Sequence, residues 1–205
     1  MATVDSLKSL LIEQVKDLYD AEKRLTKAIP KLAKASSNEA LEAALTEHLA
    51  ETREHVSRLE QVFELLDERA KGKPCKAMQG LIEEGDEHAK EDYDDDDLRD
   101  AMIIGSAQRV EHYEIAGYGT AIAHARLLEL TEVVELFEET LAEEKAADEK
   151  LTEIAESVVN LQAAEDDEDA EIVEEAPVRS RRPRAARPVA ADRPRRKPAS
   201  GRARR

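Results

Sequence analysis

Residues 98–128 read LRDAMIIGSAQRVEHYEIAGYGTAIAHARLL, and this stretch decides the fold. Apolar or small residues recur in it every three to four positions, which is the period of one face of an α-helix. Glu111 and Glu114 interrupt this apolar face near its middle. A helix of about 30 residues is roughly 45 Å long, so it needs partners of similar length to cover its apolar face. The stretch therefore predicts one long helix of a bundle, with acids that face the core.

Three other segments show the same helical period over a similar length. They are expected to form helices over about residues 5–35, 38–69 and 131–160. Pro30 lies in the last turn of the first helix and is expected to kink or end it, because proline has no backbone N–H.

Local signals mark the helix ends. Ser36 and Glu39 have the spacing of a capping box at the start of the second helix. Residues 71–74, KGKP, break the pattern, and a shorter helix is expected over about residues 75–92. The four acids of residues 94–97 can cap the long helix that follows them.

The lengths of the connections predict how the helices pack. Only a few residues separate the first long helix from the second and the third from the fourth, so each pair should form an antiparallel hairpin. A longer segment with the extra helix joins the two hairpins. We therefore expect an all-α, ferritin-like four-helix bundle over residues 1–160, with a short extra helix in the crossover.

Composition favours helices and excludes several classes of protein. Aromatic residues make up only 3%, and Ala, Leu, Glu and Lys dominate, which argues against a β-sandwich or barrel. No run of about 18 apolar residues exists, so no membrane-spanning helix is expected. The N-terminus lacks the pattern of a signal peptide, and the single cysteine, Cys75, fits a reducing compartment. We expect a cytoplasmic protein with no membrane partner.

The charge is split between an acidic body and a basic tail. Residues 178–205 hold 11 Arg, one Lys and one Asp, which is a net charge of +11. The whole chain carries −16, so the other residues carry −27. Residues 165–175 form an acidic run, and little after residue 160 can be buried. We expect residues 161–205 to be a disordered tail, separate from the bundle domain.

The cations of the tail predict weak, sequence-independent binding to a phosphate backbone. The tail has no aromatic residue with which to stack on bases. The alternative is that it folds back onto the acidic run or the acidic body. The candidate nucleic-acid contacts are Arg179, Arg181, Arg182, Arg184, Arg187, Arg193, Arg195, Arg196, Lys197, Arg202, Arg204 and Arg205.

Every long helix carries acids on its apolar face. At about 100° per residue, Glu144 and Asp148 lie about 40° apart and can point at one spot. Buried carboxylates without partners are costly and repel one another, and divalent cations relieve both costs. Carboxylates and imidazoles suit iron, manganese or zinc. The predicted metal ligands are Glu22, Glu51, Glu111, Glu114, Glu144 and Asp148.

Four more side chains near these acids are candidates for additional ligands or for hydrogen bonds to the ligands, namely His48, His55, Tyr19 and Tyr118. Taken singly, each of them fits packing or surface exposure equally well. The chain has 47 acids, so some fall on a helix face by chance. Acids at comparable depth on all four helices favour the metal site, and the similar spacing in the two hairpins suggests pseudo-twofold symmetry about it.

The chain contains, in this order, LYDAEKRLTKAIPKLAKASSNEAL (18–41), HLAETREHVSRLEQVFE (48–64), CKAMQGLIEEG (75–85), AQRVEHYEIAGYGTA (107–121) and LAEEKAADEKL (141–151). These segments resemble the YciE/YciF-like ferritin-like proteins, a bacterial and archaeal family tied to stress response. The resemblance covers about 160 residues. It implies a four-helix bundle, a homodimer and a di-metal centre with ligands drawn from the six acids above. His55 is a departure from the family pattern, which emphasises His48 to Thr52, and the Arg-rich tail lies outside the resemblance.

Two classes of function compete. The first is a cytosolic stress-response protein with two divalent metal ions, iron first and manganese or zinc as alternatives, whose redox chemistry acts on peroxide or Fe(II). The alternative is a non-enzymatic dimeric stress scaffold that associates with DNA through its Arg-rich tail. The fold alone does not choose between these classes. Metal content after purification without added iron would distinguish them.

Overall fold

The computed structural model describes the backbone of residues 4–171 and the side chains up to residue 165. Over this range the chain is helical and contains no strand. The elements in chain order are α1 (Leu7–Ala35), α2 (Glu39–Leu65), α3 (Lys76–His88), α4 (Asp96–Leu127), α5 (Thr131–Ile154), a π-helical turn η1 (Ala155–Val159) and α6 (Asn160–Glu171). The all-α prediction is confirmed, as is the short helix between the two long pairs.

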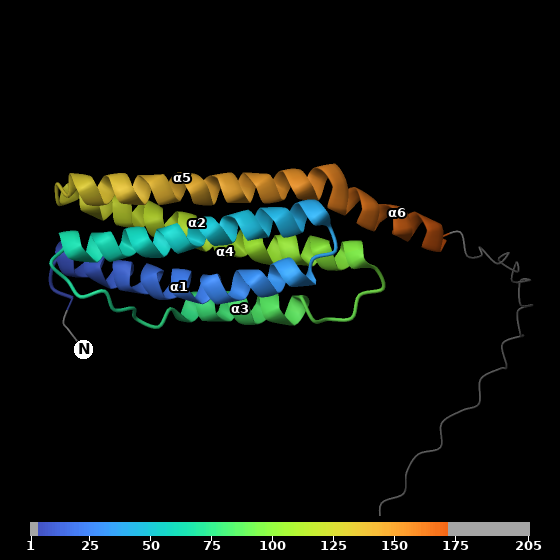
Figure 1. Ribbon diagram of the computed structural model, residues 1–205, viewed down its shortest axis with the longest axis horizontal. Helices are drawn as coiled ribbons and strands as arrows, with labels where there is room; N and C mark the ends of the chain where they lie inside the picture. The colour runs from blue at the N-terminus through green and yellow to red at the C-terminus, as the bar shows by residue number, and fades with distance from the viewer. Residues whose placement is uncertain (1–3, 172–205) are drawn as a thin grey trace, which may run out of the picture. The chain divides into compact units, whose positions relative to one another are not determined.

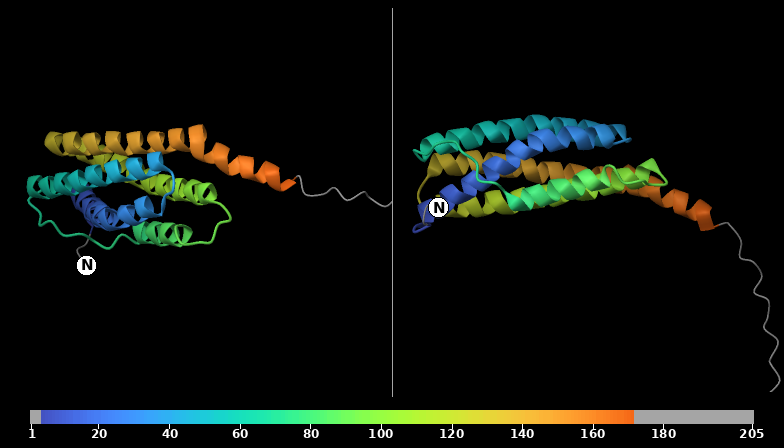
Figure 2. Two further views of the ribbon diagram at one scale, coloured as in Figure 1. Left: turned by 45° about the vertical axis from the view of Figure 1, so that its right-hand side comes forward. Right: turned by 90° about the horizontal axis from the view of Figure 1, so that it is seen from below.

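The four long helices form two antiparallel hairpins that pack against each other. α1 packs against α2 and α4 packs against α5, while contacts of α1 with α4 and of α2 with α5 join the hairpins (Figure 1). α3 lies along α1 and α4, on one side of the bundle (Figure 2). The chain therefore travels the length of the bundle between α2 and α4. This crossover is the feature of a ferritin-like bundle that the connection lengths predicted.

The first helix passes through its proline without ending. α1 begins with a capping box in which Ser6 and Ser9 accept hydrogen bonds from each other's backbone N–H groups. Pro30 lies inside the helix, which continues to the predicted end at Ala35, so of the two expected effects of the proline the ending of the helix is not observed. The proline is exposed, and the carbonyl group that it leaves without a helical partner can bond to water.

The second helix begins later than a capping box at Ser36 would require. Its N-cap is Asn38, whose side chain accepts hydrogen bonds from the N–H groups of Ala40 and Leu41. Ser36 donates its hydroxyl to the carbonyl of Leu32 instead, so the predicted capping box is wrong. A buried acid from α4, Asp100, accepts further hydrogen bonds from backbone N–H groups just before α2. This acid ties the second hairpin to the turn of the first.

The acids before α4 do not cap it through their side chains. Asp95 is the N-cap residue but makes no side-chain cap hydrogen bond. Asp96 lies in the first turn and pairs with Arg99 at 2.8 Å. The charges still lie at the positive end of the helix dipole, which favours this start. The predicted position of the helix start is therefore confirmed to within two residues, whereas side-chain capping is not observed.

The last helix continues further than the apolar pattern indicated. α5 passes through η1 into α6, which reaches Glu171, beyond the boundary expected at residue 160. Ala163 is buried, and α6 contacts α4. Residues 161–165, LQAAE, are good helix formers, so the backbone stays helical where the apolar face ends. Residues 172–205, with all the candidate nucleic-acid contacts, lie outside the described residues.

Buried apolar side chains form two clusters, one toward each end of the bundle. The first contains no aromatic member among its buried residues, includes Leu25, Leu41 and Met78, and is packed between α1, α2, α3, the first half of α4, the end of α5 and η1. The second contains the aromatic side chains Phe63 and Phe137 and lies between the other halves of the long helices. The space between the two clusters is occupied by polar side chains.

Within residues 4–171, no helix combines the length and the apolar character that a bilayer crossing would need.

Candidate metal centre

A layer of buried polar side chains crosses the bundle between its two apolar clusters. Each of the four long helices contributes to it from its inward face. Burial of this kind is unfavourable for an ionised carboxylate unless a partner compensates it. The charged or titratable members are Glu22 on α1, His48 and His55 on α2, Glu111 and Glu114 on α4, and Glu144 on α5.

Glu22, His55 and Glu144 form the first group of candidate ligands. Nδ1 of His55 lies 3.0 Å from Oε1 of Glu144 and 3.4 Å from Oε1 of Glu22. The three ligand atoms lie within 4.8 Å of one another, and the side chains are fully buried. His55 Nδ1 is close to both carboxylates, but it is aligned for a hydrogen bond with neither. Buried ligand atoms that lie this close together and form no hydrogen bonds with one another can share a cation.

His48, Glu111 and Glu144 form the second group. Nε2 of His48 lies 3.5 Å from Oε1 of Glu111 and 3.6 Å from Oε2 of Glu144. The centroids of the two imidazole rings are 6.2 Å apart. Glu144 approaches His55 with Oε1 and His48 with Oε2, so one carboxylate belongs to both groups.

Glu114 lies in neither group but is equally buried. Both of its carboxylate oxygens lack a hydrogen-bond partner, as do both oxygens of Glu144 and Oε2 of Glu22 and of Glu111. A buried polar atom without a partner costs about 1–3 kcal/mol, and more when it is charged. A hydrogen-bonded core would not contain so many unsatisfied oxygens. The donor set, carboxylates with two imidazoles, fits a pair of divalent metal ions.

Each histidine is held by an acid at its outer ring nitrogen. Nδ1 of His48 lies 3.2 Å from Glu51, and Nε2 of His55 lies 2.9 Å from Glu143. A carboxylate at the outer nitrogen holds the ring proton there, so the lone pair of the inner nitrogen faces the site. Arg58 donates hydrogen bonds to both oxygens of Glu143. Metal-binding histidines usually have such partners.

Burial governs the protonation of the inner carboxylates. It raises the pKa of Glu111 well above its ordinary value, and the charge of Glu144 raises it further. The pKa of Glu114 is also raised well above the ordinary range, first by burial and then by the charges of Glu22 and Glu144. Burial likewise raises the pKa of Glu22. These acids therefore resist ionisation until a cation compensates the charge.

His55 and Glu144 stabilise each other's charges. Burial alone would lower the pKa of His55, but Glu144 and Glu22 raise it to about 10. Burial opposes the ionisation of Glu144 as well, yet the contact with His55 leaves its pKa below the ordinary value. Without a cation, His55 carries a proton that compensates the carboxylates. A metal ion at this place must displace that proton.

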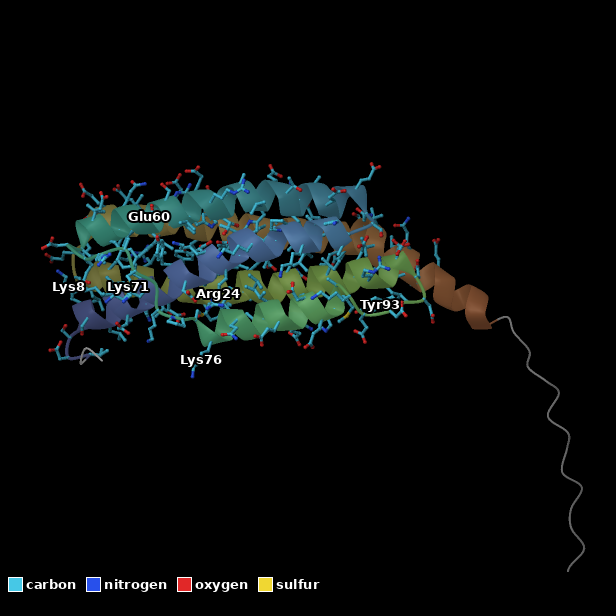
Figure 3. All side chains as sticks on the ribbon, turned by 60° about the horizontal axis from the view of Figure 1, so that its bottom comes forward. Lys8, Arg24, Glu60, Lys71, Lys76 and Tyr93 are labelled. Carbon is cyan, nitrogen blue, oxygen red and sulfur yellow. The ribbon has the colours of Figure 1, made fainter. Side chains whose placement is uncertain are left out.

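The two tyrosines that the sequence singled out have different positions. Tyr118 is buried and donates a hydrogen bond to Oε1 of Glu22 at 2.5 Å, so it orients a candidate ligand. Tyr19 donates to Glu60 at 2.6 Å. Glu60 is an exposed residue of α2 (labelled in Figure 3), so the hydroxyl of Tyr19 has its partner outside the polar layer, while the tyrosine ring packs against Phe63.

Two of the six predicted ligands lie outside both groups. The Glu51 side chain is 37% exposed and contacts the site only through His48. Asp148 accepts a hydrogen bond from Gln108 at 3.1 Å and lies 3.3 Å from the exposed His112. Their role as ligands stays a prediction, but the contacts in the structure give each of them another partner. The structure brings the other four acids together with His48 and His55.

Glu143 and Arg58 were not among the residues predicted from the sequence. Adjacent helical residues point about 100° apart, so Glu143 was excluded from the inward face by its neighbour Glu144. Arg58 follows His55 by three positions, which places it one turn along the same side of α2. That spacing was an available signal, but only the packing of α5 against α2 shows that both reach His55.

Comparison with known proteins places the chain in a family. The model of a family described as a domain of unknown function, DUF892, matches residues 6–164. The chain belongs to this family. Protein YciF of Escherichia coli (strain K12) is 45% identical over 159 residues, which cover 77% of this chain and 95% of YciF. The resemblance to YciF-like proteins that the sequence motifs indicated is confirmed.

Solved structures of other proteins share the fold of this DUF892 chain. The crystal structure of YciF, called a stress protein of E. coli, matches with a TM-score of 0.73 and 44% identity and covers 77% of this chain and 99% of YciF. YcfI of Rhodopseudomonas palustris, for which a structural role has been suggested, matches with a TM-score of 0.71 and 44% identity over 73% and 94% of the two chains. A Xanthomonas campestris protein with 20% identity and a TM-score of 0.62, matched over 79% of this chain and 99% of its own, supports the fold alone.

Proposed function

We propose that this chain is a stress-response protein that binds two divalent metal ions, iron first, in the polar layer of its bundle. The observation that supports this best is Glu144, whose two unpartnered oxygens each approach a different histidine. One ion would be held by Glu22 and His55, the other by His48 and Glu111, and Glu144 would contact both. Glu114 supplies two more free oxygens to the same layer.

The rest of the layer supports such a centre without binding the ions itself. Glu51 and Glu143 hold the proton on the outer nitrogen of each histidine, and Tyr118 orients Glu22. The apolar clusters on both sides limit water around the carboxylates. A pair of redox-active metals bound here would supply one- and two-electron chemistry toward peroxide or Fe(II). The stress role is inferred from YciF, at 45% identity.

A structural role without metal is the competing proposal, suggested by the relative YcfI. In that case the polar layer would serve only to align the helices. The unpartnered oxygens oppose this reading, because a layer that only aligns helices gains from hydrogen bonds within it. A cytoplasmic homodimer and DNA binding by the tail remain predictions under either proposal.

Elemental analysis of the protein purified without added iron tests the proposal directly. We expect about two metal ions per chain, as in the two-metal carboxylate bundles. Glu144→Ala should lose both ions, whereas Asp148→Asn, at the rim of the layer, should keep them. Wild-type protein without metal, and without uptake of Fe(II), Mn(II) or Zn(II) during dialysis, would refute the proposal and favour the structural role.

A further inference from the structure

A cavity of about 190 Å³ lies between α2 and α5, directly outside the second histidine group. Its inner end is formed by His48 and Glu111 and its outer end by Glu47 and Lys150, whose side chains are largely exposed. The cavity therefore extends from the surface to the candidate ligands. We call it the access cavity.

The inner end of the access cavity carries an unsatisfied ligand atom. Glu111 is 3% exposed, lines the cavity and has no hydrogen-bond partner for its Oε2. His48 lines the cavity beside it. A cation that moved inward through the cavity would therefore meet two candidate ligands of the second group.

The walls of the access cavity consist of small side chains and of carboxylates. Space is left by the small side chains of Ala44, Ala146 and Ala147. Glu51 lines the same cavity, with a side chain that solvent reaches and that contacts His48. Lys150, the one cation among the lining residues, is paired with Glu47 at the mouth. Because Glu47 offsets Lys150, the carboxylate of Glu51 is left to attract cations and repel anions, while Glu111 at the inner end ionises when a cation arrives.

A second opening among the described residues reaches the same ligands but is less suitable for an ion. It lies between α1, α3 and α4 and leads to His48 and Glu111 through aliphatic side chains such as Leu25 and Ile82. Its free space is about 20 Å³, close to that of a single water molecule. Asp86 and Ser106 also line this opening, but a hydrated divalent ion does not fit in so small a space and would have to lose most of its water among aliphatic side chains, which is costly.

We propose that the access cavity is the route by which a divalent cation reaches the centre, and that Glu51 binds the cation on its way in. This inference rests on the proposed metal-binding function. It gives Glu51 a role that agrees with its position at the border between solvent and His48. The Lys150–Glu47 pair would then affect the rate of cation uptake, since Lys150 offsets part of the negative charge at the mouth.

The test follows the uptake of Co(II) by metal-free protein, with visible absorbance for the rate and elemental analysis for the final amount. Ala147→Leu fills the access cavity and should slow uptake by about tenfold, with unchanged final stoichiometry. Ala146→Leu, at a more exposed position, is a second blocking variant. The matched control is Gly85→Ala, which fills the aliphatic opening: its new Cβ would meet Ser106 at an ordinary 3.6 Å, and uptake should not change.

Two polar variants test the charge argument. Glu51→Gln should slow uptake, and Lys150→Gln should speed it severalfold at low salt, with the gain disappearing as salt screens the mouth. Slower uptake in Gly85→Ala, with normal rates in both leucine variants, would overturn the proposal and assign the route to the aliphatic opening. Equal rates and stoichiometry in all variants would refute the route but leave the proposed function intact. Absence of Co(II) binding to the wild type would refute both.

Discussion

The His55 group and the His48 group share Glu144, yet they differ in what lies behind the histidine. At the outer nitrogen of His55, Glu143 accepts hydrogen bonds from Arg58 with both of its oxygens, and the imidazole is completely buried. Behind His48, Glu51 is 37% exposed and the access cavity reaches the ring. Glu143 is 29% exposed, so the two outer acids differ little in exposure, and the contrast lies in the Arg58 pair behind His55 and the cavity that reaches His48. We call the His55 group the sealed site and the His48 group the open site. A sealed site favours retention of an ion, whereas an open site favours exchange.

The largest expected effect removes both groups at once. Glu144→Ala eliminates the carboxylate that the two groups share, so metal content should fall from about two ions per chain to none. Metal at a hundred times its dissociation constant stabilises the native state by about 2.7 kcal/mol, which the variant would lose. Thermal unfolding with and without chelator should therefore differ by several degrees for wild type and not for Glu144→Ala. Retention of one ion by the variant would show that the groups do not depend on a common ligand.

The pH dependence of the metal-free protein tests the sealed group. The pKa of His55 is raised to about 10, so its stabilising contribution is complete below the unfolded value of about 6.5 and is lost as the pH rises toward 10. The raised pKa values of Glu111 and Glu114 act in the same direction above about pH 4.5, because ionisation is more costly in the folded state. Chelator-treated protein should thus lose stability steadily from about pH 6 to pH 10.

Denaturant melts at several pH values measure this loss. In the variant His55→Gln, the free energy of unfolding should fall less between about pH 6.5 and 10, because the group that titrates there is gone. Saturating metal should also flatten the curve, since bound metal replaces the protons. A rise in the stability of the metal-free wild type across this range would contradict the assignment.

The outer acids distinguish the two sites more finely. Glu143→Gln removes the charge that orients His55 and leaves Arg58 without its ion pair, and should weaken metal affinity by about 10–100-fold. Glu51→Gln should weaken equilibrium affinity less, because water can reach His48 and replace part of the contact. Calorimetric titration of each variant with Co(II) would measure both effects. A larger loss in Glu51→Gln would indicate that Glu51 is a ligand in the final complex, as the sequence predicted.

The smallest effect is expected at Glu114. Glu114→Gln replaces a buried carboxyl group, which must take up a proton to fold in the metal-free protein, with a neutral amide, so the metal-free protein at neutral pH should gain about 1 kcal/mol. In excess metal the same variant should be less stable than wild type, because two free oxygens are lost from the layer. Opposite signs in chelated and metal-loaded unfolding experiments would place Glu114 at the centre. Equal destabilisation in both conditions would show that it serves packing only.

Much of the fold could be predicted from the sequence. The helical period of residues 98–128 and the short connections on either side of the crossover were sufficient for the bundle. Helix ends were less predictable, because caps depend on distant residues. Asp100 accepts hydrogen bonds from the backbone N–H groups of Ser37 and Asn38, which lie 63 and 62 positions away, and no local pattern near Ser36 could indicate it.

The sequence by itself determined that acids of α1, α4 and α5 lie on inward faces at similar depth, whereas on α2 the buried titratable residues are His48 and His55 and the predicted acid, Glu51, is 37% exposed. Burial confirms this for Glu22, Glu111, Glu114 and Glu144. It follows from the helical period alone, because a residue on an apolar stripe must face the core wherever the stripe is covered.

Only the tertiary structure decided which side chains meet. Glu51 and His48 share one side of α2, but it is the packing of α5 against α2 that brings Glu144 to both histidines and leaves Glu51 at the border with solvent. The physical reason is that the period of a helix gives the direction of a side chain, whereas contact also depends on the axial offset and spacing of the neighbouring helices. The helical period places Glu143 on the side of α5 and not on its inward face. It still contacts His55, because the axial offset between α5 and α2 brings the two residues to the same level.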